Sequence, residues 1–303
     1  MMKKFEEALW NLTEEKRIFK EEPMAKHTTF RVGGPAEYYL MPDRKELPEV
    51  IRCCGEYQIP YLVIGNGSNL LVSDKGIRGA VIEIGKNISA IRVEEGRIYA
   101  EAGALLSKTA HTALEHGLTG MEFAAGIPGC MGGAVVMNAG AYGGEMKDII
   151  ASVTVLTKQG EEKKLRVEEL DLSYRHSCIP QQEYLVLEAE LALQPGKQEE
   201  IRARMEELKA KRNEKQPLEY PSAGSTFKRP EGYYAGKLIM EAGLRGFQVG
   251  GAAVSEKHCG FVINKEQASA TDIYRLMQEV QQRVQQQFGV KLEPEVKMVG
   301  DFR

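Results

Sequence analysis

Seven glycines fall within the twenty residues 126–145, which read "GIPGCMGGAVVMNAGAYGGE". Glycine at this density lets backbone N–H groups approach a ligand without interference from Cβ atoms. Successive N–H groups of a turn can then bind an anion such as a diphosphate. The alternative is a pair of loops that use glycine for structural reasons. Asn138 and Tyr142, which lie within the segment, favour a cofactor that carries a diphosphate.

A second glycine-containing segment, "IGNGSNLLVSD" at residues 64–74, follows the apolar run "YLVI". It begins like the dinucleotide signature G-x-G-x-x-G, but Leu70 stands where the third glycine would be. By itself it is a poor signature, and a purely structural loop is equally compatible with it. The phosphate-loop pattern G-x-x-x-x-G-K-[ST] is absent from the sequence, which argues against an ATPase.

The pattern of the whole chain indicates an α+β fold with a mixed sheet. Short β-rich runs separated by glycine turns alternate with a few helices, and 303 residues exceed one ordinary core, so two or three domains are expected. "VTVLTKQGEEKKL" predicts a hairpin with its turn at Gln159 and Gly160. Apolar spacing predicts a charged amphipathic helix over residues 1–22 and a long helix over residues 270–290 that packs on a sheet.

Composition excludes several classes of protein. The net charge is −3 with both signs spread along the chain, so we expect neither a nucleic-acid face nor a basic membrane anchor. No signal peptide or spanning segment is evident, and the five cysteines lack a C-x-x-C pair, which indicates reduced thiols in a cytoplasmic protein. The five histidines lack ligand spacing, so no bound metal is expected.

Seven segments resemble, in the same order, the UDP-N-acetylenolpyruvoylglucosamine reductases, the MurB family of bacterial peptidoglycan synthesis. The resemblance runs from about His27 to the C-terminus, and its short spacing after the serine motif is similar to the shorter, type II form of the family. The segments are "HTTFRVGGPAEYYLMP", "GNGSNLLVSD", "GIPGCMGGAVVMNAGAYGGE", "LSYRHS", "AGSTFKRP", "AGKLIMEAGLRGFQVGGAAVSEKHCGFVIN" and "LEPEVKMVG".

The resemblance implies an enzyme that reduces UDP-N-acetylglucosamine enolpyruvate to UDP-N-acetylmuramate, with non-covalent FAD and with NADPH as co-substrate. It implies an FAD-binding fold of the vanillyl-alcohol-oxidase (PCMH) type in two small lobes, plus a separate α+β substrate domain. The expected partner is the UDP-sugar substrate, with no obligate protein partner. The expected segments are an N-terminal helix 1–22, FAD-binding lobes 23–85 and 86–198, a linking helix 199–217, and a substrate domain 218–303 whose last strand brings Glu295 to the active site.

The same resemblance places the cofactor on the two glycine-containing segments. The cofactor-binding residues that it implies are Gly65, Asn66, Gly67, Ser68, Asn69, Leu70, Gly126, Ile127, Pro128, Gly129, Gly132, Gly133 and Ala134.

Three residues match the family's catalytic positions. Hydride addition to an enol ether that carries a carboxylate builds negative charge on the neighbouring carbon and the carboxylate, so cationic or hydrogen-donating groups and a proton are needed. Arg175 supplies a fork that binds the carboxylate, Glu295 assists in its protonated form, and Ser225 gives the proton to carbon. Outside the family, Arg175 would be interpreted as a surface ion pair and Ser225 as a turn residue, because no G-x-S-x-G elbow surrounds it.

Five further residues are candidates for the substrate, each with a simpler interpretation. Lys228 and Lys237 suit phosphates or the carboxylate, or are solvated charges. Tyr174 can stack on the substrate or fill a core. His258 can touch the substrate or be structural, and Asn138 can lie near substrate or nicotinamide or cap a turn.

One position departs from the family pattern. The family commonly has "FKNP" where this chain has "FKRP", so Arg229 replaces an asparagine expected to face the substrate. Either the guanidinium reaches a phosphate instead, or this position points elsewhere.

Two other functions compete with this interpretation. The first is a flavin oxidase that has the same FAD-binding fold and acts on an alcohol or hydroxy acid. Such oxidases often tie the flavin to a histidine or cysteine, and Cys130 is the one such residue in the glycine-containing segments. The second is a binding protein that has lost its chemistry. Loss of Ser225 or Glu295 would mark it, and both are present.

Overall fold

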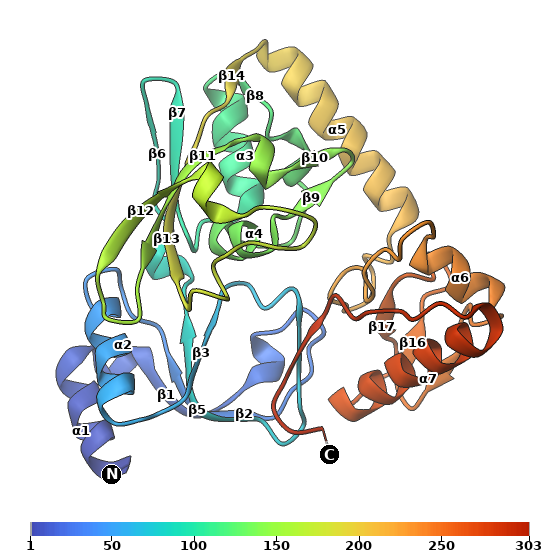
Figure 1. Cartoon of the computed structure of the whole chain (residues 1–303), viewed down its shortest axis with the longest axis horizontal. Coiled ribbons are helices and arrows are strands. Elements are labelled where there is room, and N and C mark those ends of the chain that lie inside the picture. Colours follow the sequence, from blue (N-terminus) through green and yellow to red (C-terminus); the bar gives the residue numbers. More distant parts are fainter. Residues whose placement is uncertain (1, 303) are drawn as a thin grey trace. The chain divides into compact units, whose positions relative to one another are not determined.

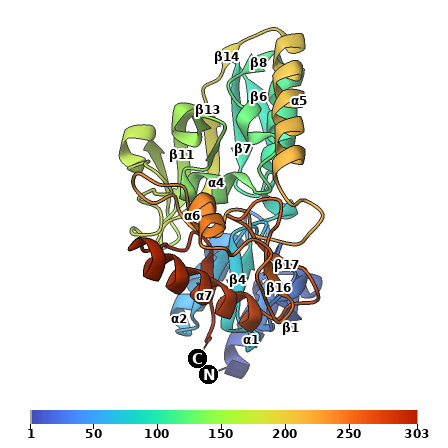
Figure 2. The same ribbon diagram turned by 90° about the vertical axis from the view of Figure 1, so that its right-hand side faces the viewer.

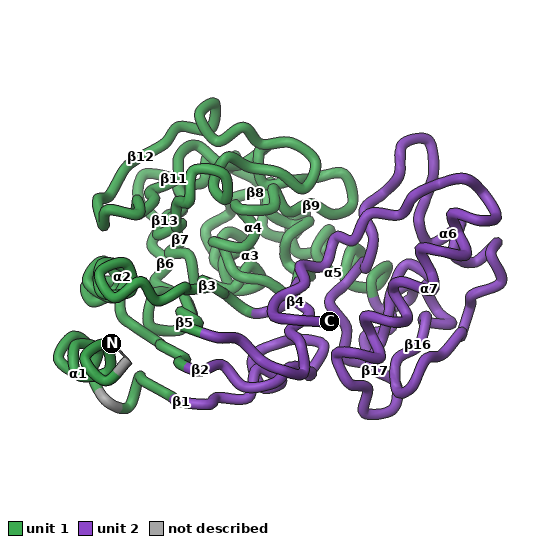
Figure 3. Tube along the Cα trace, turned by 60° about the horizontal axis from the view of Figure 1, so that its bottom comes forward, with its two compact units in different colours: residues 1–19, 38–66, 79–212 green, residues 20–37, 67–78, 213–303 purple. Residues whose placement is uncertain are grey.

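The structure is a computed structural model that describes residues 2–302 and divides into two compact units (Figure 3). Unit 1 comprises residues 1–19, 38–66 and 79–212, and unit 2 comprises residues 20–37, 67–78 and 213–303. Both units mix helices and strands, which confirms the α+β class. Unit 2 is assembled from three separate stretches of chain, whereas the expected segments were consecutive. The finer division into lobes stays a prediction.

The largest sheet lies in unit 1 and has the strand order β12-β11-β13-β7-β6, with all neighbours antiparallel (Figure 1). Its strands are β6 (Ile91–Glu94), β7 (Arg97–Glu101), β11 (Ile150–Leu156), β12 (Glu162–Arg166) and β13 (Leu185–Leu191). β11 and β12 form the predicted hairpin, and Gly160 takes a φ of 79° in its turn. A left-handed turn residue of this kind favours glycine.

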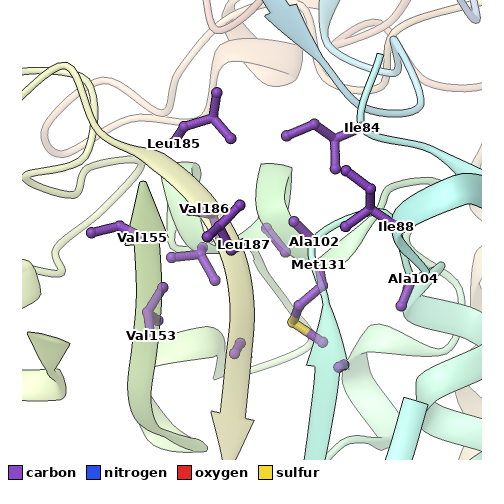
Figure 4. Packing of buried hydrophobic residues seen from close by; sticks show 14 of the residues in the cluster. Ile84, Ile88, Ala102, Ala104, Met131, Val153, Val155, Leu185, Val186 and Leu187 are labelled. Atoms are coloured by element: carbon purple, nitrogen blue, oxygen red, sulfur yellow. The ribbon is translucent and has the colours of Figure 1, made fainter. Parts of the chain in front are cut away.

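Helix α4 (Met131–Met137) packs on this sheet, against β13 and β7. Met131, Val153, Val155 and Leu187 are buried in one hydrophobic cluster, of which Figure 4 shows a part. A Cβ added at Gly132 would lie 3.0 Å from the Cβ of Ala102, so the helix approaches the chain just after β7 closely. The start of α4, which belongs to the glycine-dense segment, is therefore fixed to the sheet by close packing.

The chain before residue 198 also forms a four-stranded sheet of order β1-β2-β5-β3, in which β3 and β5 run parallel. Its strands are β1 (Ile18–Pro23), β2 (Pro35–Leu40), β3 (Tyr61–Ile64) and β5 (Ile77–Glu83). The other helices and short strands are α1 (Met2–Leu12), α2 (Leu47–Glu56), α3 (Leu106–Glu115), β8 (Leu118–Thr119) paired with β14 (Gln194–Pro195), and β9 (Gly140–Ala141) paired with β10 (Gly144–Glu145).

The N-terminal helix is shorter than the sequence predicts. α1 ends at Leu12, and β1 begins at Ile18. Arg17 forms ion pairs with Asp43 and Glu46, at 3.1 and 2.7 Å. The prediction of a helix over residues 1–22 is therefore wrong beyond Leu12: only a short 3-10 turn, Glu15–Arg17, follows, and Arg17 is bound by carboxylates that are distant in the sequence.

Unit 2 contains a three-stranded antiparallel sheet covered by a long helix (Figure 2). Its strands are β15 (Gln248–Val249), β16 (Ala252–Val254) and β17 (Val262–Asn264), and its helices are α6 (Ala235–Glu241) and α7 (Ala270–Phe288). α7 confirms the predicted helix. Ser269 and Asp272 form a capping box at its start, and Gly289 ends it at a φ of 69°. Its buried face consists of Ala270, Ile273, Leu276, Met277, Val280 and Val284.

The C-terminal end of the chain joins unit 2 as a strand. β18 (Lys297–Val299) pairs in parallel with β4 (Leu70–Val72), which lies within the glycine-containing segment 64–74. Beyond β4, the carboxylate of Asp74 accepts hydrogen bonds from the backbone N–H groups of Ala270 and Thr271, at 2.8 and 2.9 Å. An acidic side chain suits this position because the first N–H groups of α7 have no partner within the helix.

α5 (Gln198–Lys215) is the helix predicted over residues 199–217, and the division between the units falls within it, after Arg212. Its buried face is narrow, formed by Ile201, Met205 and Leu208. None of the helices in the described residues combines the length and the apolarity needed to cross a membrane.

Glu190 on β13 supports the large sheet through charge. Its carboxylate lies 2.9 Å from Lys164 Nζ, 2.6 Å from Ser152 Oγ and 2.6 Å from Arg97 Nη1, and these partners lower the pKa of Glu190 to about 2. A carboxyl with a lowered pKa stabilises the fold above its unfolded pKa and loses this contribution as the pH falls towards its folded pKa.

We expect Glu190→Gln to lower the free energy of unfolding by about 1–2 kcal/mol at pH 7, because three favourable partners are lost or weakened. The difference from wild type should shrink between about pH 4.5 and pH 2. Urea denaturation at several pH values measures it, and Glu162→Gln, at an exposed pair with Arg44, is the control. A Glu190→Gln deficit that is constant with pH would contradict the assignment.

Candidate active site

The two glycine-containing segments, which are sixty residues apart in the sequence, contact each other in unit 1. A Cβ at Gly65 would overlap the sulfur of Cys130, so only glycine fits at this approach. The side-chain amide of Asn66 donates to the carbonyl of Pro128 at 3.3 Å. Gly65 and Asn66 thus lie against residues 128 and 130, in the same stretch of chain as the predicted cofactor residues 126–129 and 132–134.

The glycine-dense segment 126–145 places Gly132 and Gly133 at the beginning of α4, and we call this stretch the glycine surface. The N–H groups of Met131 and Gly132 donate to Ala104 O and Ala102 O, at 2.8 and 2.7 Å, which fixes the backbone here. Gly133 is exposed, and a Cβ at this position would meet nothing closer than Cys130 Sγ, at 4.0 Å. The segment therefore leaves the space beside Gly133 open for a ligand, as a cofactor with a diphosphate requires.

The other predicted cofactor residues of segment 64–74, residues 67–70, belong to unit 2. Gly67 takes a φ of 59°, and a Cβ there would overlap the carbonyl oxygen of His27. Asn69 is held against the end of the chain. Its side-chain amide donates to Glu295 O at 3.0 Å, and its carbonyl accepts from Lys297 N at 3.0 Å. The structure thereby joins a predicted cofactor residue to the backbone of a predicted catalytic residue.

Arg175 lies at the tip of a two-residue hairpin in unit 1. The N–H of Ser173 donates to His176 O at 3.2 Å, and the N–H of His176 donates back to Ser173 O at 3.1 Å. Tyr174 is 53% exposed, and the Arg175 guanidinium lies 5.3 Å from the centre of its ring. Arg175 has a φ of 55°, a left-handed conformation that costs energy for an arginine. Strain of this kind is often found at functional sites.

Ser225 and Glu295 are brought together in unit 2 by the backbone around them. Glu295 N donates to Thr226 O at 2.9 Å, and Lys228 N donates to Glu293 O at 2.8 Å, so the two segments run side by side. Thr226 is fully buried and its hydroxyl accepts from Val262 N at 2.9 Å. Ser225 itself is exposed. The buried Thr226, which follows it directly, fixes the backbone that carries the Ser225 hydroxyl.

The predicted substrate residues of unit 2 differ in how firmly they are held. Lys228 and Lys237 form only long ion pairs, 3.5 Å to Glu293 and 3.7 Å to Glu241. The Nδ1 atom of His258 accepts from Gly260 N at 3.1 Å, and burial lowers the pKa of this imidazole below its ordinary value. His258 is therefore neutral with its proton on Nε2, where it can act as a donor.

Arg229, the departure from the family pattern, packs on a neighbouring aromatic residue. Its guanidinium lies 4.1 Å from the centre of the Tyr234 ring, and its Nε donates to Tyr233 O at 3.4 Å.

Asn138, a predicted substrate residue, is buried at the end of α4 and takes a φ of 43°. Both N–H groups of its amide are used within unit 1, by Glu145 and by Ser173 O.

Arg212 on α5 is a candidate that the sequence did not reveal. Its side chain lies over Gly126. A Cβ added at Gly126 would be 3.2 Å from Cδ of Arg212 and 3.3 Å from its Nη1. Arg212 is half-buried, burial lowers its pKa, and within the described residues it has neither a hydrogen bond nor an ion pair. No local signal distinguishes it, because it is one of many charges on a charged helix.

The part of the chain that the structure covers holds no group of three or more His, Cys, Asp or Glu side chains arranged for a metal ion. The expectation that no metal binds stays a prediction.

Two family models match the chain. Residues 35–166 match the FAD binding domain, and residues 216–299 match the C-terminal domain of UDP-N-acetylenolpyruvoylglucosamine reductase. The first match spans Gly65, Asn66 and the glycine-dense segment, and the second spans Ser225 and Glu295. Arg175 and Arg212 lie outside both matched ranges.

Relatives with this reductase name cover nearly the whole chain. The chain is 59% identical to the UDP-N-acetylenolpyruvoylglucosamine reductase of Agathobacter rectalis over 94% of its own length and 95% of that protein. It is 51% identical to that of Caldanaerobacter subterraneus over 97% of both. The solved structure of the reductase (MurB) from Thermus caldophilus superposes with a TM-score of 0.80 at 37% identity, over 92% of this chain and 97% of that one. These similarities confirm the predicted fold class.

Proposed function

The chain belongs to the UDP-N-acetylenolpyruvoylglucosamine reductase family, and from this premise we propose how its residues divide the work of the reaction. The enzyme reduces UDP-N-acetylglucosamine enolpyruvate to UDP-N-acetylmuramate in peptidoglycan synthesis, with FAD as cofactor and NADPH as co-substrate. FAD bound to this chain would supply the transfer of a hydride from NADPH to the terminal carbon of the enol ether. The assignment of the chain to the type II form of the family stays a prediction, and so does a cytoplasmic location of the protein.

The glycine surface of unit 1 fits this cofactor, and we place FAD there on residues 65, 66, 126–129 and 132–134. The support is that Gly65 and Asn66 contact residues 128 and 130, while Gly133 leaves open space beside the beginning of α4. That residues 67–70 of unit 2 also bind FAD stays a prediction. The buried sulfur of Cys130 packs against Gly65, which disfavours a covalent flavin link and hence the oxidase alternative.

We assign the substrate carboxylate to Arg175. A guanidinium at the tip of a tight turn offers two parallel donors, and these stabilise the negative charge that builds up on the carboxylate. Glu295 shares this task in its protonated form, since a carboxyl group donates a hydrogen bond only while it holds its proton. Ser225 gives its proton to the neighbouring carbon. The observation that carries the pairing of Ser225 with Glu295 is the hydrogen bond from Glu295 N to Thr226 O.

The remaining polar residues are proposed to bind the rest of the substrate. The ion pairs of Lys228 and Lys237 are long and exposed, so a phosphate can replace their carboxylate partners at little cost. His258 is proposed to donate from Nε2, and Tyr174 to stack on the substrate. Arg229 is proposed to reach a phosphate, because a planar guanidinium suits that group.

One experiment tests the function and the order of the two half-reactions. The purified protein is mixed anaerobically with NADPH, and flavin absorbance is followed until it bleaches. UDP-N-acetylglucosamine enolpyruvate is then added, and we expect the oxidised spectrum to return with formation of UDP-N-acetylmuramate. A colourless protein, or a bleached flavin that the substrate does not reoxidise, would defeat the proposal.

Arg212 is proposed to neutralise a phosphate of the bound dinucleotide. Replacing a charged donor that pairs with an anion costs about 1.5–3 kcal/mol, so we expect Arg212→Gln to raise the dissociation constant for FAD by about tenfold to 100-fold. Titration of the deflavinated protein with FAD, followed by fluorescence quenching, measures this. Arg202→Gln changes an exposed arginine on the same helix and should leave the affinity unchanged. If only the KM for NADPH rises, the guanidinium does not serve FAD.

A further inference from the structure

We propose that Asn138 is a positioning residue for Arg175: its side-chain amide, at the end of α4, holds the Ser173 carbonyl and thereby sets the turn that carries the guanidinium. The inference rests on the proposed role of Arg175. It gives Asn138 a task in the reaction that needs no contact with substrate or nicotinamide.

The hydrogen bonds of Asn138 leave it no donor for a ligand. Nδ2 donates to Glu145 Oε2 at 2.6 Å and to Ser173 O at 3.1 Å, while Oδ1 accepts from Lys147 N at 2.8 Å. An asparagine amide has two N–H donors, and both are used. With a side chain that is 1% exposed, Asn138 is part of the support of the site and not of its surface.

A second bond ties the same turn to the same end of α4. The hydroxyl of Ser177, also 1% exposed, donates to Val136 O at 2.7 Å. The two attachments, at residues 173 and 177, flank the hairpin on both sides. The hairpin that carries Arg175 therefore cannot shift along α4 without breaking two hydrogen bonds made by buried side chains.

The backbone explains why asparagine suits this position. Asn138 ends α4 in the left-handed conformation, with φ 43° and ψ 57°. Glycine and asparagine are the residues that adopt this conformation most readily at the end of a helix. Glycine would meet the backbone requirement without the tether, so asparagine is the residue that meets both.

α4 connects the proposed cofactor surface to the hairpin that carries Arg175, both of them in unit 1. It begins in the glycine surface, where Met131 N and Gly132 N are fixed to residues 104 and 102, and it ends at the Asn138 tether. Seven helical residues at about 1.5 Å each span roughly 10 Å. A short rigid helix thus sets the spacing between the proposed cofactor surface and the hairpin of Arg175.

The test uses the holoenzyme with Asn138→Gly, which keeps the backbone conformation and removes the tether. We expect the flavin spectrum and bleaching by NADPH to be unchanged, because the beginning of α4 is untouched. Reoxidation by the enolpyruvyl substrate should slow by about tenfold to 100-fold, since a displacement near 1 Å can cost that much. Calorimetry should show a parallel loss of affinity of the oxidised holoenzyme for UDP-N-acetylmuramate.

Three variants separate positioning from a general loss of stability. Asn87→Gly removes another amide that donates to a backbone carbonyl of unit 1, Met41 O at 2.7 Å, and should leave reoxidation unchanged. Asn138→Asp combined with Glu145→Gln restores the bond between these two positions with reversed polarity but gives Ser173 O no donor, so it should remain slow. Ser177→Ala should show a smaller defect in the same step.

The inference fails if Asn138→Gly reoxidises at the wild-type rate, if it slows bleaching by NADPH as much as reoxidation, or if the double variant recovers the wild-type rate. Failure of the proposed function is a different result, since in that case the wild-type protein itself is not reoxidised by the substrate.

Discussion

Ser225→Ala should slow reoxidation of the reduced enzyme by the enolpyruvyl substrate by about 10²- to 10⁴-fold, the usual contribution of a placed proton donor. Bleaching of the flavin by NADPH should proceed at the wild-type rate, because the hydroxyl serves only the second half-reaction. Stopped-flow absorbance measures both rates in one sample. Ser225 is exposed, and the buried contacts of this segment are made by Thr226, so the alanine variant should keep the wild-type fold.

Ser222→Ala is the matched control for this result. Ser222 lies three residues earlier in the same segment and bridges to Ile263 through its backbone, which alanine preserves. We expect it to reoxidise at nearly the wild-type rate. Normal turnover of Ser225→Ala would show that the proton comes from another group, and the assignment would then be withdrawn.

Arg175→Asn should lower the rate of the same step by about 10²- to 10³-fold, the typical cost of losing one donor to a developing oxyanion. Asparagine tolerates the left-handed backbone at this position, so the loss reports on the guanidinium and not on the turn. Arg175→Lys should fall between wild type and Arg175→Asn, because an ammonium keeps the charge but not the planar fork.

The control for Arg175 is Arg166→Asn, an exposed arginine of unit 1 that pairs only loosely, at 3.9 Å, with Glu169. It should leave both half-reactions unchanged. If Arg175→Asn binds UDP-N-acetylmuramate and turns over like wild type, the substrate carboxylate is not held by this residue.

Strong local patterns predicted the elements that the structure confirms. α7 follows from its apolar face and its capping residues, and the β11–β12 hairpin follows from a turn glycine between two β-rich runs. The N-terminal helix was overextended because a charged stretch with helical spacing does not reveal that Arg17 binds Asp43 and Glu46. Local periodicity does not contain such long-range contacts.

The sequence could nominate the candidate site only as a set of residues and not as an arrangement, and their roles stay a prediction. Each of Arg175, Ser225 and Glu295 is ordinary by itself, and only the ordered motifs selected them. The contact of Gly65 with Cys130 and the hydrogen bond of Asn69 with Glu295 O join segments far apart in the chain, which no spacing rule foretells. Arg212 was missed because its lack of a partner is a property of the folded surroundings.

The parallel pairing of β4 with β18 has a consequence for how the protein is made. β4 is synthesised well before its partner strand, because the two strands lie far apart along the chain. At about 5–20 residues per second, ribosomes need on the order of ten to fifty seconds to translate the stretch between them. Throughout that time the nascent chain carries a strand with an open edge, the kind of edge that pairs with other chains. Chaperone protection during translation should therefore matter more for unit 2 than for unit 1.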